Sequence, residues 1–397
     1  MKNKSLVKDC SGIEGIPKEF FSPKEIADLV QYLKELGDEK IRIGGGLSGV
    51  SGGAVPNENE VFIDLRNLKN IAWVDESAGI FEVECGVLIS DIINFVEAAG
   101  WCFPIVPGSL NIATIGGFVA CNGGGGFSLK YGKIGKYVLG LDVISASGEI
   151  SFFGSFVTKN SEFPPMEQLF IGSEGRLGII SKILFRCIPK KSKVYHYRIS
   201  HQNLDELLQL QLKLVKMGAI LLEVAERDAL KFSSNVDENV IWVVFEEQKE
   251  IKLTNDFTII EGDETLLEER FKIGHSIQNY KKFIDVDFSI PLKNTLFVVL
   301  EIKKILNSYS LEHVFFGHGG DGNWHLHIFE NNHFENIEKA IFEIDVIIRE
   351  KNGNISGEHG IGRIHKKRFQ LIKSPNLLLL QSIKKYMDPK TQFPELL

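Results

Sequence analysis

The spacing of apolar residues changes near the middle of this chain, and it predicts two regions of different structure. In the first half, Ser22-Pro23-Lys24-Glu25 has the form of a helix start with its N-cap at Ser22, and apolar residues at helical spacing follow up to Gly37. A second helix is predicted at residues 88–99, and short apolar runs predict strands at 40–43, 61–65, 80–85, 137–145, 150–153 and 178–188. The first half is therefore expected to be rich in β-structure.

In the second half of the chain, predicted helices and strands alternate. Helices are predicted at 204–217, 265–283 and 334–351, and strands at 219–226, 240–246, 313–318 and 324–329. The polar stretch Pro189-Lys190-Lys191-Ser192-Lys193 separates the two halves and predicts a domain boundary. The fold class that follows is α+β, with an antiparallel sheet in the second domain.

Composition narrows the classes of function. A chain of 397 residues suits two domains, and a formal net charge of −7 argues against nucleic-acid binding, which usually needs a basic excess. No apolar run reaches the roughly 18 residues needed to span a bilayer, and the first residues lack the apolar core of a signal peptide. The five cysteines are scattered without a Cys-x-x-Cys pair, so we expect a cytoplasmic protein with reduced, mostly buried thiols.

Three glycine-rich segments lie in the first half, at residues 44–53, 107–126 and 172–180. Glycine lets consecutive backbone N–H groups converge on one anion, most often a pyrophosphate. No Gly-Lys-Ser/Thr ends the first segment and no helix clearly follows it, which excludes a Walker loop and a Rossmann fingerprint. Tight turns in a β-rich domain would explain any one segment, but the three together favour a cofactor cradle.

Histidine and acidic residues gather late in the chain. Residues 317–327 read Gly-His-Gly-Gly-Asp-Gly-Asn-Trp-His-Leu-His around Asp321-Gly322, a hairpin signal, and Ser-Gly-Glu-His-Gly follows at 356–360. If the turn centres on Asp321-Gly322, His318 lies directly opposite His325, and two imidazoles at that spacing can hold one metal ion. Glu358 is then the candidate third ligand. Two solvated histidines on a hairpin are the alternative.

Taken as a set, these segments resemble the FAD-linked oxidases of the vanillyl-alcohol oxidase / p-cresol methylhydroxylase (PCMH) superfamily. From Ile41 to Gly362 the chain is similar to the D-2-hydroxy-acid dehydrogenases, the group of the glycolate oxidase catalytic subunit, D-lactate dehydrogenase and D-2-hydroxyglutarate dehydrogenase. The resemblance implies a two-part PCMH-type FAD-binding domain at 1–189 and an FAD-linked oxidase C-terminal domain at 190–370. The latter is a ferredoxin-like cap, an antiparallel sheet plus helices, and residues 371–397 would return to the FAD domain.

The resemblance also implies FAD. We expect it to be bound non-covalently, because no histidine that could attach the flavin occurs between Arg42 and Gly53. The residues expected to contact FAD are Gly44, Gly45, Gly46, Leu47, Ser48, Gly49, Pro107, Gly108, Ser109, Thr114, Gly116, Gly117, Asn122, Gly123, Gly124, Gly126, Glu174, Gly178, Ile179 and Ile180.

In this group the late segments bind a divalent metal, and the resemblance carries that role to His318, His325 and Glu358. Zn²⁺ and Mn²⁺ both suit such a mixed nitrogen and oxygen set. His359 would be the catalytic base, and His327 a supporting or packing residue. The implied reaction converts a D-2-hydroxy acid of the glycolate or D-lactate type to the 2-oxo acid, by metal-assisted proton abstraction and hydride transfer to flavin N5.

The chain departs from this family at the residues that usually bind the substrate carboxylate. The arginine that usually clamps the substrate carboxylate falls on Gly274, and a lysine found in some relatives aligns with Asp285. The basic residues near these positions in sequence are each expected to be solvated surface charges; they are Arg270, Lys282 and Lys293. A bidentate carboxylate clamp is therefore expected to be missing.

Two other functions stay open. One is an FAD oxidoreductase of the same fold that acts on a different alcohol, which the missing arginine favours. The other is a flavoprotein subunit of a multi-subunit electron-transfer complex. The electron acceptor could be a quinone, an electron-transfer protein, a partner subunit or oxygen. A homodimer, a hetero-oligomer and a location at the inner face of the membrane through a partner all agree with the sequence.

Overall fold

The structure is a computed structural model that describes residues 5–190, 193–234, 236–253, 256–330, 334–370 and 374–396. Lys191 and Ser192 of the predicted linker, and residues 371–373 and 397 of the predicted C-terminal segment, lie outside these ranges. The chain divides into two compact units. The first comprises Met1–Gly124, Lys133–Lys190 and His359–Leu397, and the second comprises Gly125–Gly132 and Lys191–Glu358.

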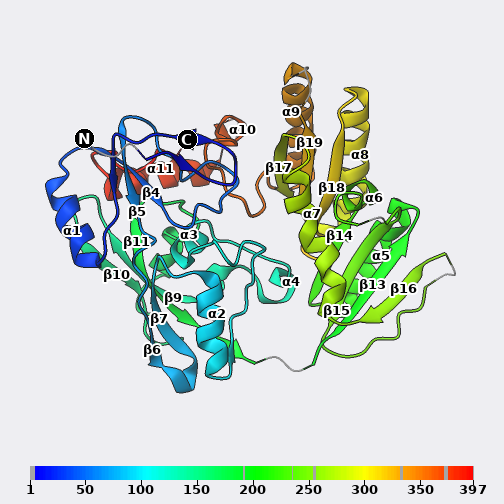
Figure 1. The fold of residues 1–397 in the computed structure, drawn as a ribbon, viewed down its shortest axis with the longest axis horizontal. Coiled ribbons are helices and arrows are strands. Elements are labelled where there is room, and N and C mark those ends of the chain that lie inside the picture. Colours follow the sequence, from blue (N-terminus) through cyan, green and yellow to red (C-terminus); the bar gives the residue numbers. More distant parts are fainter. Residues whose placement is uncertain are drawn as a thin grey trace. The chain divides into compact units, whose positions relative to one another are not determined.

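The first unit has a parallel and an antiparallel part (Figure 1). The parallel sheet has the order β3 (Glu19–Phe21), β5 (Glu60–Asp64), β4 (Lys40–Gly44), and all five residues of the central β5 are buried, as is typical of a strand covered on both faces. The antiparallel sheet has the order β10 (Ile150–Gly154), β9 (Val138–Ile144), β11 (Ile179–Arg186), β7 (Ile80–Glu84), β6 (Ile71–Asp75). The first unit also has two separate two-stranded sheets. They are β1 (Val7–Lys8) with β2 (Glu14–Gly15), and β8 (Trp101–Cys102) with β12 (Ile188–Pro189).

Helices of the first unit come from both ends of the chain. They are α1 (Ile26–Glu35), α2 (Ile89–Ala98), α3 (Ile115–Ala120), α10 (Lys366–Gln370) and α11 (Pro375–Met387). Lys384 of α11 is buried and donates to the main-chain oxygen of Arg176 at 2.6 Å. The C-terminal residues are therefore an integral part of the first unit.

The second unit is built on a seven-stranded antiparallel sheet, drawn in green to orange in Figure 1. Its order is β16 (Thr258–Gly262), β13 (Tyr195–His201), β15 (Asn239–Phe245), β14 (Leu221–Ala225), β18 (His313–His318), β19 (Asn323–Phe329), β17 (Phe283–Ser289). The helices are α4 (Ser128–Tyr131), α5 (Leu204–Lys216), α6 (Arg227–Leu230), α7 (Glu268–Gln278), α8 (Thr295–Ser308) and α9 (Phe334–Glu350). The predicted α+β class with an antiparallel sheet is confirmed.

One face of this sheet carries both a hydrophobic core and the polar side chain of Glu223. Ile273 and Ile277 of α7 pack in a cluster with Trp242 and Phe316 of the strands. Residues of the other parity, such as Leu222 and Val224 of β14, point to the opposite face because side chains alternate along a strand. Helix α7 thus covers the face that also presents Glu223.

Several details differ from the sequence predictions. Helix α1 begins after Glu25, whose side chain forms a capping box with Asp28, so the predicted N-cap at Ser22 is wrong. The predicted helix at 265–283 ends at Gln278, and Phe283 already starts β17. Strands β13 and β16 and helices α8 and α11 were not predicted. Cys85 and Cys187 are the buried cysteines, whereas Cys10 and Cys121 are exposed, so the expectation of mostly buried thiols is wrong.

None of the helices in the described ranges combines the length and the apolar character that crossing a membrane requires.

Candidate active site

The hairpin of β18 and β19 brings two histidines to one face of the second unit's sheet. The paired residues are His318 with Asn323 and Phe316 with His325, so the predicted direct opposition of His318 and His325 is wrong. The turn spans residues 319–322 and is longer than a two-residue turn at Asp321-Gly322. Because the two histidines are diagonal neighbours of matching parity, they still share a face, with ring centroids 5.4 Å apart.

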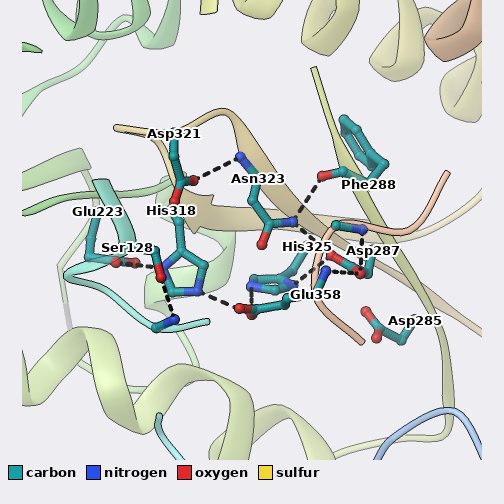
Figure 2. A network of polar contacts seen from close by, with 12 residues as sticks. Ser128, Glu223, Asp285, Asp287, Phe288, His318, Asp321, Asn323, His325 and Glu358 are labelled. Atoms are coloured by element: carbon teal, nitrogen blue, oxygen red, sulfur yellow. Dashed lines mark hydrogen bonds and ion pairs between the residues drawn. The ribbon is translucent and has the colours of Figure 1, made fainter. Parts of the chain in front are cut away.

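Glu358 meets both histidines at one carboxylate oxygen (Figure 2). Its Oε1 lies 3.2 Å from His318 Nε2 and 3.4 Å from His325 Nε2. One potential ligand atom from each of these three residues lies within 4.8 Å of the other two. Two imidazoles and a carboxylate at this spacing are a donor set that suits a divalent transition metal.

A buried carboxylate stands behind His318. Glu223 of β14 is fully buried, and its Oε1 lies 2.6 Å from His318 Nδ1, on the side of the ring away from Glu358. Its Oε2 lies 2.8 Å from Arg270 Nη2, and the Arg270 guanidinium sits 4.9 Å from the Phe316 ring centroid. Arg270 is only 6% exposed, so the expectation of a solvated surface charge is wrong for it. Lys282 and Lys293 are exposed as expected.

These neighbours perturb the ionisation of the site. Burial alone would raise the pKa of Glu223, but the charges of His318 and Arg270 outweigh burial and lower that pKa below its usual value. Burial disfavours the charged form of His318, yet the carboxylates of Glu223 and Glu358 outweigh it and raise the pKa of His318 well above its usual value. The negative charge around the imidazole rings therefore favours a positive charge at this point.

A second buried carboxylate fixes the segment that carries Glu358. Asp287 of β17 is fully buried, and its Oδ2 accepts hydrogen bonds from the backbone N–H groups of Gly357 at 2.7 Å and Glu358 at 2.8 Å. Its Oδ1 accepts from Asn323 Nδ2 at 2.7 Å. Asp287 thus ties the loop of Glu358 to the hairpin that carries the two histidines, which holds all three donors in one arrangement.

The chain leaves the second unit directly after Glu358, and His359 is the first residue of the last stretch of the first unit. Within the first unit, the next residues are held by Glu174. Its Oε1 accepts from Ile361 N at 2.9 Å and its Oε2 from Gly362 N at 2.8 Å, while Arg176 pairs with it at 2.9 Å. Glu358 and His359 therefore lie between two anchored ends, each fixed by a carboxylate that accepts two backbone N–H groups.

The glycine-rich segments come together in the first unit. The Thr114 hydroxyl accepts a hydrogen bond from Gly46 N at 3.2 Å, and a Cβ at Gly46 would lie 1.8 Å from the main-chain oxygen of Ile112. The third segment joins them, because Glu174 N donates to Ala120 O at 2.8 Å. Glycine at position 46 thus lets the first two segments approach each other with backbone rather than side chains between them. A cradle of converging backbone N–H groups suits a pyrophosphate.

The remaining predicted cofactor residues have varied environments. Gly126 belongs to the second unit, where a Cβ would lie 3.1 Å from Glu223 Oε1. Ile179 and Ile180 are buried in β11, and the Asn122 side chain accepts from Gly135 N at 3.2 Å. Gly44 ends β4, and Gly116 and Gly117 lie in α3. The others lie in loops of the first unit; they are Gly45, Leu47, Ser48, Gly49, Pro107, Gly108, Ser109, Gly123, Gly124 and Gly178.

Sequence reasoning missed Glu223 and Asp287. Glu223 is the one acidic residue of Leu-Leu-Glu-Val-Ala in β14, and Asp287 is the second of two acidic residues among the apolar positions of Phe-Ile-Asp-Val-Asp-Phe-Ser in β17. Burying a carboxylate costs free energy unless it is paired, so such a residue in a buried strand signals a specific partner. That signal is present in the sequence, but it does not name the partner.

Two family models match the chain. The FAD binding domain model covers residues 17–154, and the model of the C-terminal domain of FAD linked oxidases covers residues 221–393. The alkyldihydroxyacetonephosphate synthase structure shares the fold, with a TM-score of 0.71 and 14% sequence identity over 95% of this chain and 76% of that one.

Curated relatives are similar over nearly the full chain. Glycolate oxidase subunit GlcD from Bacillus subtilis is 25% identical, covering 95% of this chain and 88% of that protein. D-lactate dehydrogenase from Archaeoglobus fulgidus is 27% identical, covering 92% of this chain and 87% of that protein. The mitochondrial D-2-hydroxyglutarate dehydrogenase of Arabidopsis thaliana is also 27% identical, over 95% and 74%.

Proposed function

Since the chain belongs to the FAD-linked oxidases, with an FAD binding domain followed by their C-terminal domain, we propose that it oxidises a D-2-hydroxy acid to the 2-oxo acid. The chain is an FAD-dependent oxidoreductase of the glycolate, D-lactate and D-2-hydroxyglutarate dehydrogenase type. The observation that carries the finer proposal is the cluster of His318, His325 and Glu358. A vicinal hydroxyl and carboxylate on the substrate would suit such a centre, because together they form a chelate.

The residues of the cluster fit a divalent metal, Zn²⁺ or Mn²⁺. The Nε2 atoms of both histidines approach the same Glu358 oxygen, and Glu223 occupies Nδ1 of His318, which leaves its Nε2 as the donor for a metal. A metal held there would supply positive charge that lowers the pKa of the substrate hydroxyl. Asp287 and Asn323 contribute by holding the loop and the hairpin in register.

The base in this proposal is His359. It follows Glu358 in a loop anchored on both sides by Asp287 and Glu174, and it is not one of the three proposed metal donors. In its neutral form it would take the proton of the substrate hydroxyl. The α-hydrogen and its electron pair leave the substrate as hydride, so the alcohol loses two electrons and becomes a carbonyl.

The glycine cradle of the first unit fits non-covalent FAD, which when bound accepts that hydride at N5. The close packing of Gly46 against Ile112 and Thr114 leaves backbone rather than side chains along the cradle. The first glycine segment has no histidine between Arg42 and Gly53, which supports non-covalent binding.

A second candidate is the same chemistry on an alcohol that has no carboxylate for a clamp. This candidate is favoured by Gly274, which stands where relatives usually have the arginine that binds the substrate carboxylate. The glycine offers no charge, and a Cβ there would meet nothing within 4 Å. A third candidate, a subunit of an electron-transfer complex, draws support from the relative named as glycolate oxidase subunit GlcD. This role is compatible with catalysis, and a quinone, an electron-transfer protein or a partner subunit could then receive the electrons.

The experiment is anaerobic reduction of the flavin in wild type and in His359→Ala. We expect D-2-hydroxy acids to bleach the wild-type flavin, and His359→Ala to retain FAD while losing at least a hundredfold in the rate of reduction. His275→Ala, which removes an exposed histidine of α7, is the control and should reduce at the wild-type rate. Full-rate bleaching in His359→Ala would refute the assignment of the base.

A further inference from the structure

Asp285 of β17, which is partly exposed, and the buried His327 of β19 lie beside the proposed metal centre. They are directly opposed in the strand register, and His327 Nε2 lies 3.3 Å from Asp285 Oδ1. Their side chains are 13% and 8% exposed, respectively. One carboxylate oxygen of Asp285 lies within 4.8 Å of a ring nitrogen of His325. A carboxylate therefore stands next to one of the proposed metal ligands, on the same face of the sheet.

Two aromatic rings hold His327, the neighbour of Asp285, in place. His327 stacks on Phe283 with ring centroids 4.1 Å apart, and it meets Phe316 edge-on at 5.0 Å. An imidazole held by two aromatic rings has little freedom to turn, so its Nε2 keeps a fixed place 3.3 Å from Asp285 Oδ1. The acid thus has a defined direction, as a recognition group needs.

Negative charge dominates this face. Five carboxylates lie around the two histidines (Figure 2): Glu223, Asp285 and Asp287 on strands, Asp321 in the turn of the hairpin, and Glu358 in the loop after α9. The guanidinium on this face, Arg270, is already engaged by Glu223 at 2.8 Å. A second carboxylate, at the end of a substrate side chain that reaches Asp285, would lie beside a like charge, which disfavours binding.

Helix α7 has open space at Gly274, on the side that carries Arg270. Gly274 lies four residues after Arg270 and so occupies the side of the helix that carries Arg270. A Cβ at Gly274 would meet no heavy atom within 4 Å. Glycine destabilises a helix interior relative to alanine, and no close neighbour requires it here. The glycine therefore leaves room on the side of α7 that carries Arg270.

We propose that Asp285, oriented by His327, recognises the side chain of the substrate. The substrate class that follows is a monocarboxylic 2-hydroxy acid whose side chain carries a hydroxyl or ammonium donor. Such a donor satisfies the Asp285 carboxylate with a charge-assisted hydrogen bond, a methyl group leaves it without that bond, and a carboxylate is repelled. This inference rests on the proposed function, because it concerns the same site.

The test uses D-2-hydroxy acids of four carbons that differ only at the end of the side chain. They are D-2,4-dihydroxybutyrate, D-4-amino-2-hydroxybutyrate, D-2-hydroxybutyrate and D-malate. With the full-length, FAD- and metal-loaded protein, we expect kcat/KM for the two donor-bearing acids to exceed that for D-2-hydroxybutyrate by about tenfold. D-malate should be about tenfold or more below D-2-hydroxybutyrate.

Asp285→Asn should compress this ranking. D-malate should gain about tenfold relative to the other acids, and the ammonium-bearing acid should lose its advantage. The control is Glu312→Gln, which removes one negative charge from an exposed residue that pairs with Lys281 and should leave the ranking unchanged. A binding measurement without turnover gives a second readout: wild type should bind 2-oxobutyrate at least tenfold more tightly than oxaloacetate by calorimetry.

Failure of this inference can be told apart from failure of the proposed function. If D-2-hydroxy acids reduce the flavin but D-malate equals or exceeds D-2-hydroxybutyrate in wild type, the role of Asp285 is refuted and the reaction stands. The same conclusion follows if Asp285→Asn leaves the ranking of the acids unchanged. If no D-2-hydroxy acid reduces the flavin, the proposed function fails as well.

Discussion

His318 uses both of its ring nitrogens: Nδ1 lies 2.6 Å from Glu223 Oε1, and Nε2 lies 3.2 Å from Glu358 Oε1. The two carboxylates differ in setting, because Glu223 is fully buried and Glu358 is partly exposed. Glu223 fixes the position of the proton on Nδ1, and this choice makes Nε2 the nitrogen that can bind a metal. His318 and Glu223 together therefore define how the proposed centre can bind a metal.

Glu223→Gln should weaken metal binding by about 10–100-fold, because the neutral amide no longer stabilises a metal-bound imidazole through Nδ1. Metal affinity is measured by competition with a chromophoric chelator, and FAD content should stay constant. Glu261→Gln is a suitable control, since Glu261 lies in the exposed edge strand β16. Equal metal affinity in Glu223→Gln and wild type would remove Glu223 from the centre.

Glu174→Gln should loosen the residues that follow Glu358 and His359. In wild type its two oxygens accept from Ile361 N and Gly362 N, and the loss of one charged acceptor weakens at least one of these bonds. Amide hydrogen exchange at Ile361 and Gly362 should accelerate several-fold, whereas exchange in β18 and β19 should not change. Unaltered protection at both amides would mean that Glu174 does not anchor the loop.

Lys384→Met should destabilise the first unit by about 3 kcal/mol. The Lys384 ammonium pairs with Asp388, a carboxylate that is 1% exposed, and donates to Arg176 O at 2.6 Å. Removing the lysine leaves Asp388 buried without its cation. The neighbouring exposed residue supplies the control: Lys385→Met should change the free energy of unfolding by less than about 0.5 kcal/mol. Urea unfolding that gives the same free energy for both variants would contradict the account.

Gly274→Arg should add a cation on the side of α7 that carries Arg270. Because a Cβ there meets nothing within 4 Å, the variant should fold, and the helix should gain up to about 1 kcal/mol from the loss of glycine. The added cation offsets the negative charge of this face, so kcat/KM for D-malate should rise by about tenfold over wild type. Gly274→Ala is the matched control, with the gain in stability but no gain with D-malate.

The α+β class and the three donors of the proposed centre were accessible from the sequence because they depend on local patterns. Apolar spacing predicts β18 and β19, and the glycine and histidine segments mark the site. The register of His318 with Asn323 was not accessible, since a turn with glycine at 319, 320 and 322 can close in more than one place. The difference between the predicted and the observed register has little effect on the site, because both registers put His318 and His325 on one face.

Contacts between distant segments account for the rest. Arg270 follows Glu223 by nearly fifty residues, and only the packing of α7 on the sheet brings the two together. Read alone, an arginine in a polar helix start predicts a surface charge. Asp287 and Glu358 are likewise joined by the fold, so the sequence could identify Glu358 as a ligand without identifying what holds it in place.

In the proposed reaction, oxidation of a D-2-hydroxy acid requires a metal held by His318, His325 and Glu358. The decisive measurement is anaerobic flavin reduction with D- and L-2-hydroxy acids before and after chelation, with Zn²⁺ or Mn²⁺ then restored. The account predicts bleaching by a D-acid and not its L-enantiomer, loss of at least a hundredfold in rate after chelation with FAD still bound, and recovery on return of the metal. Bleaching at an unchanged rate in the chelated, metal-free protein would contradict it.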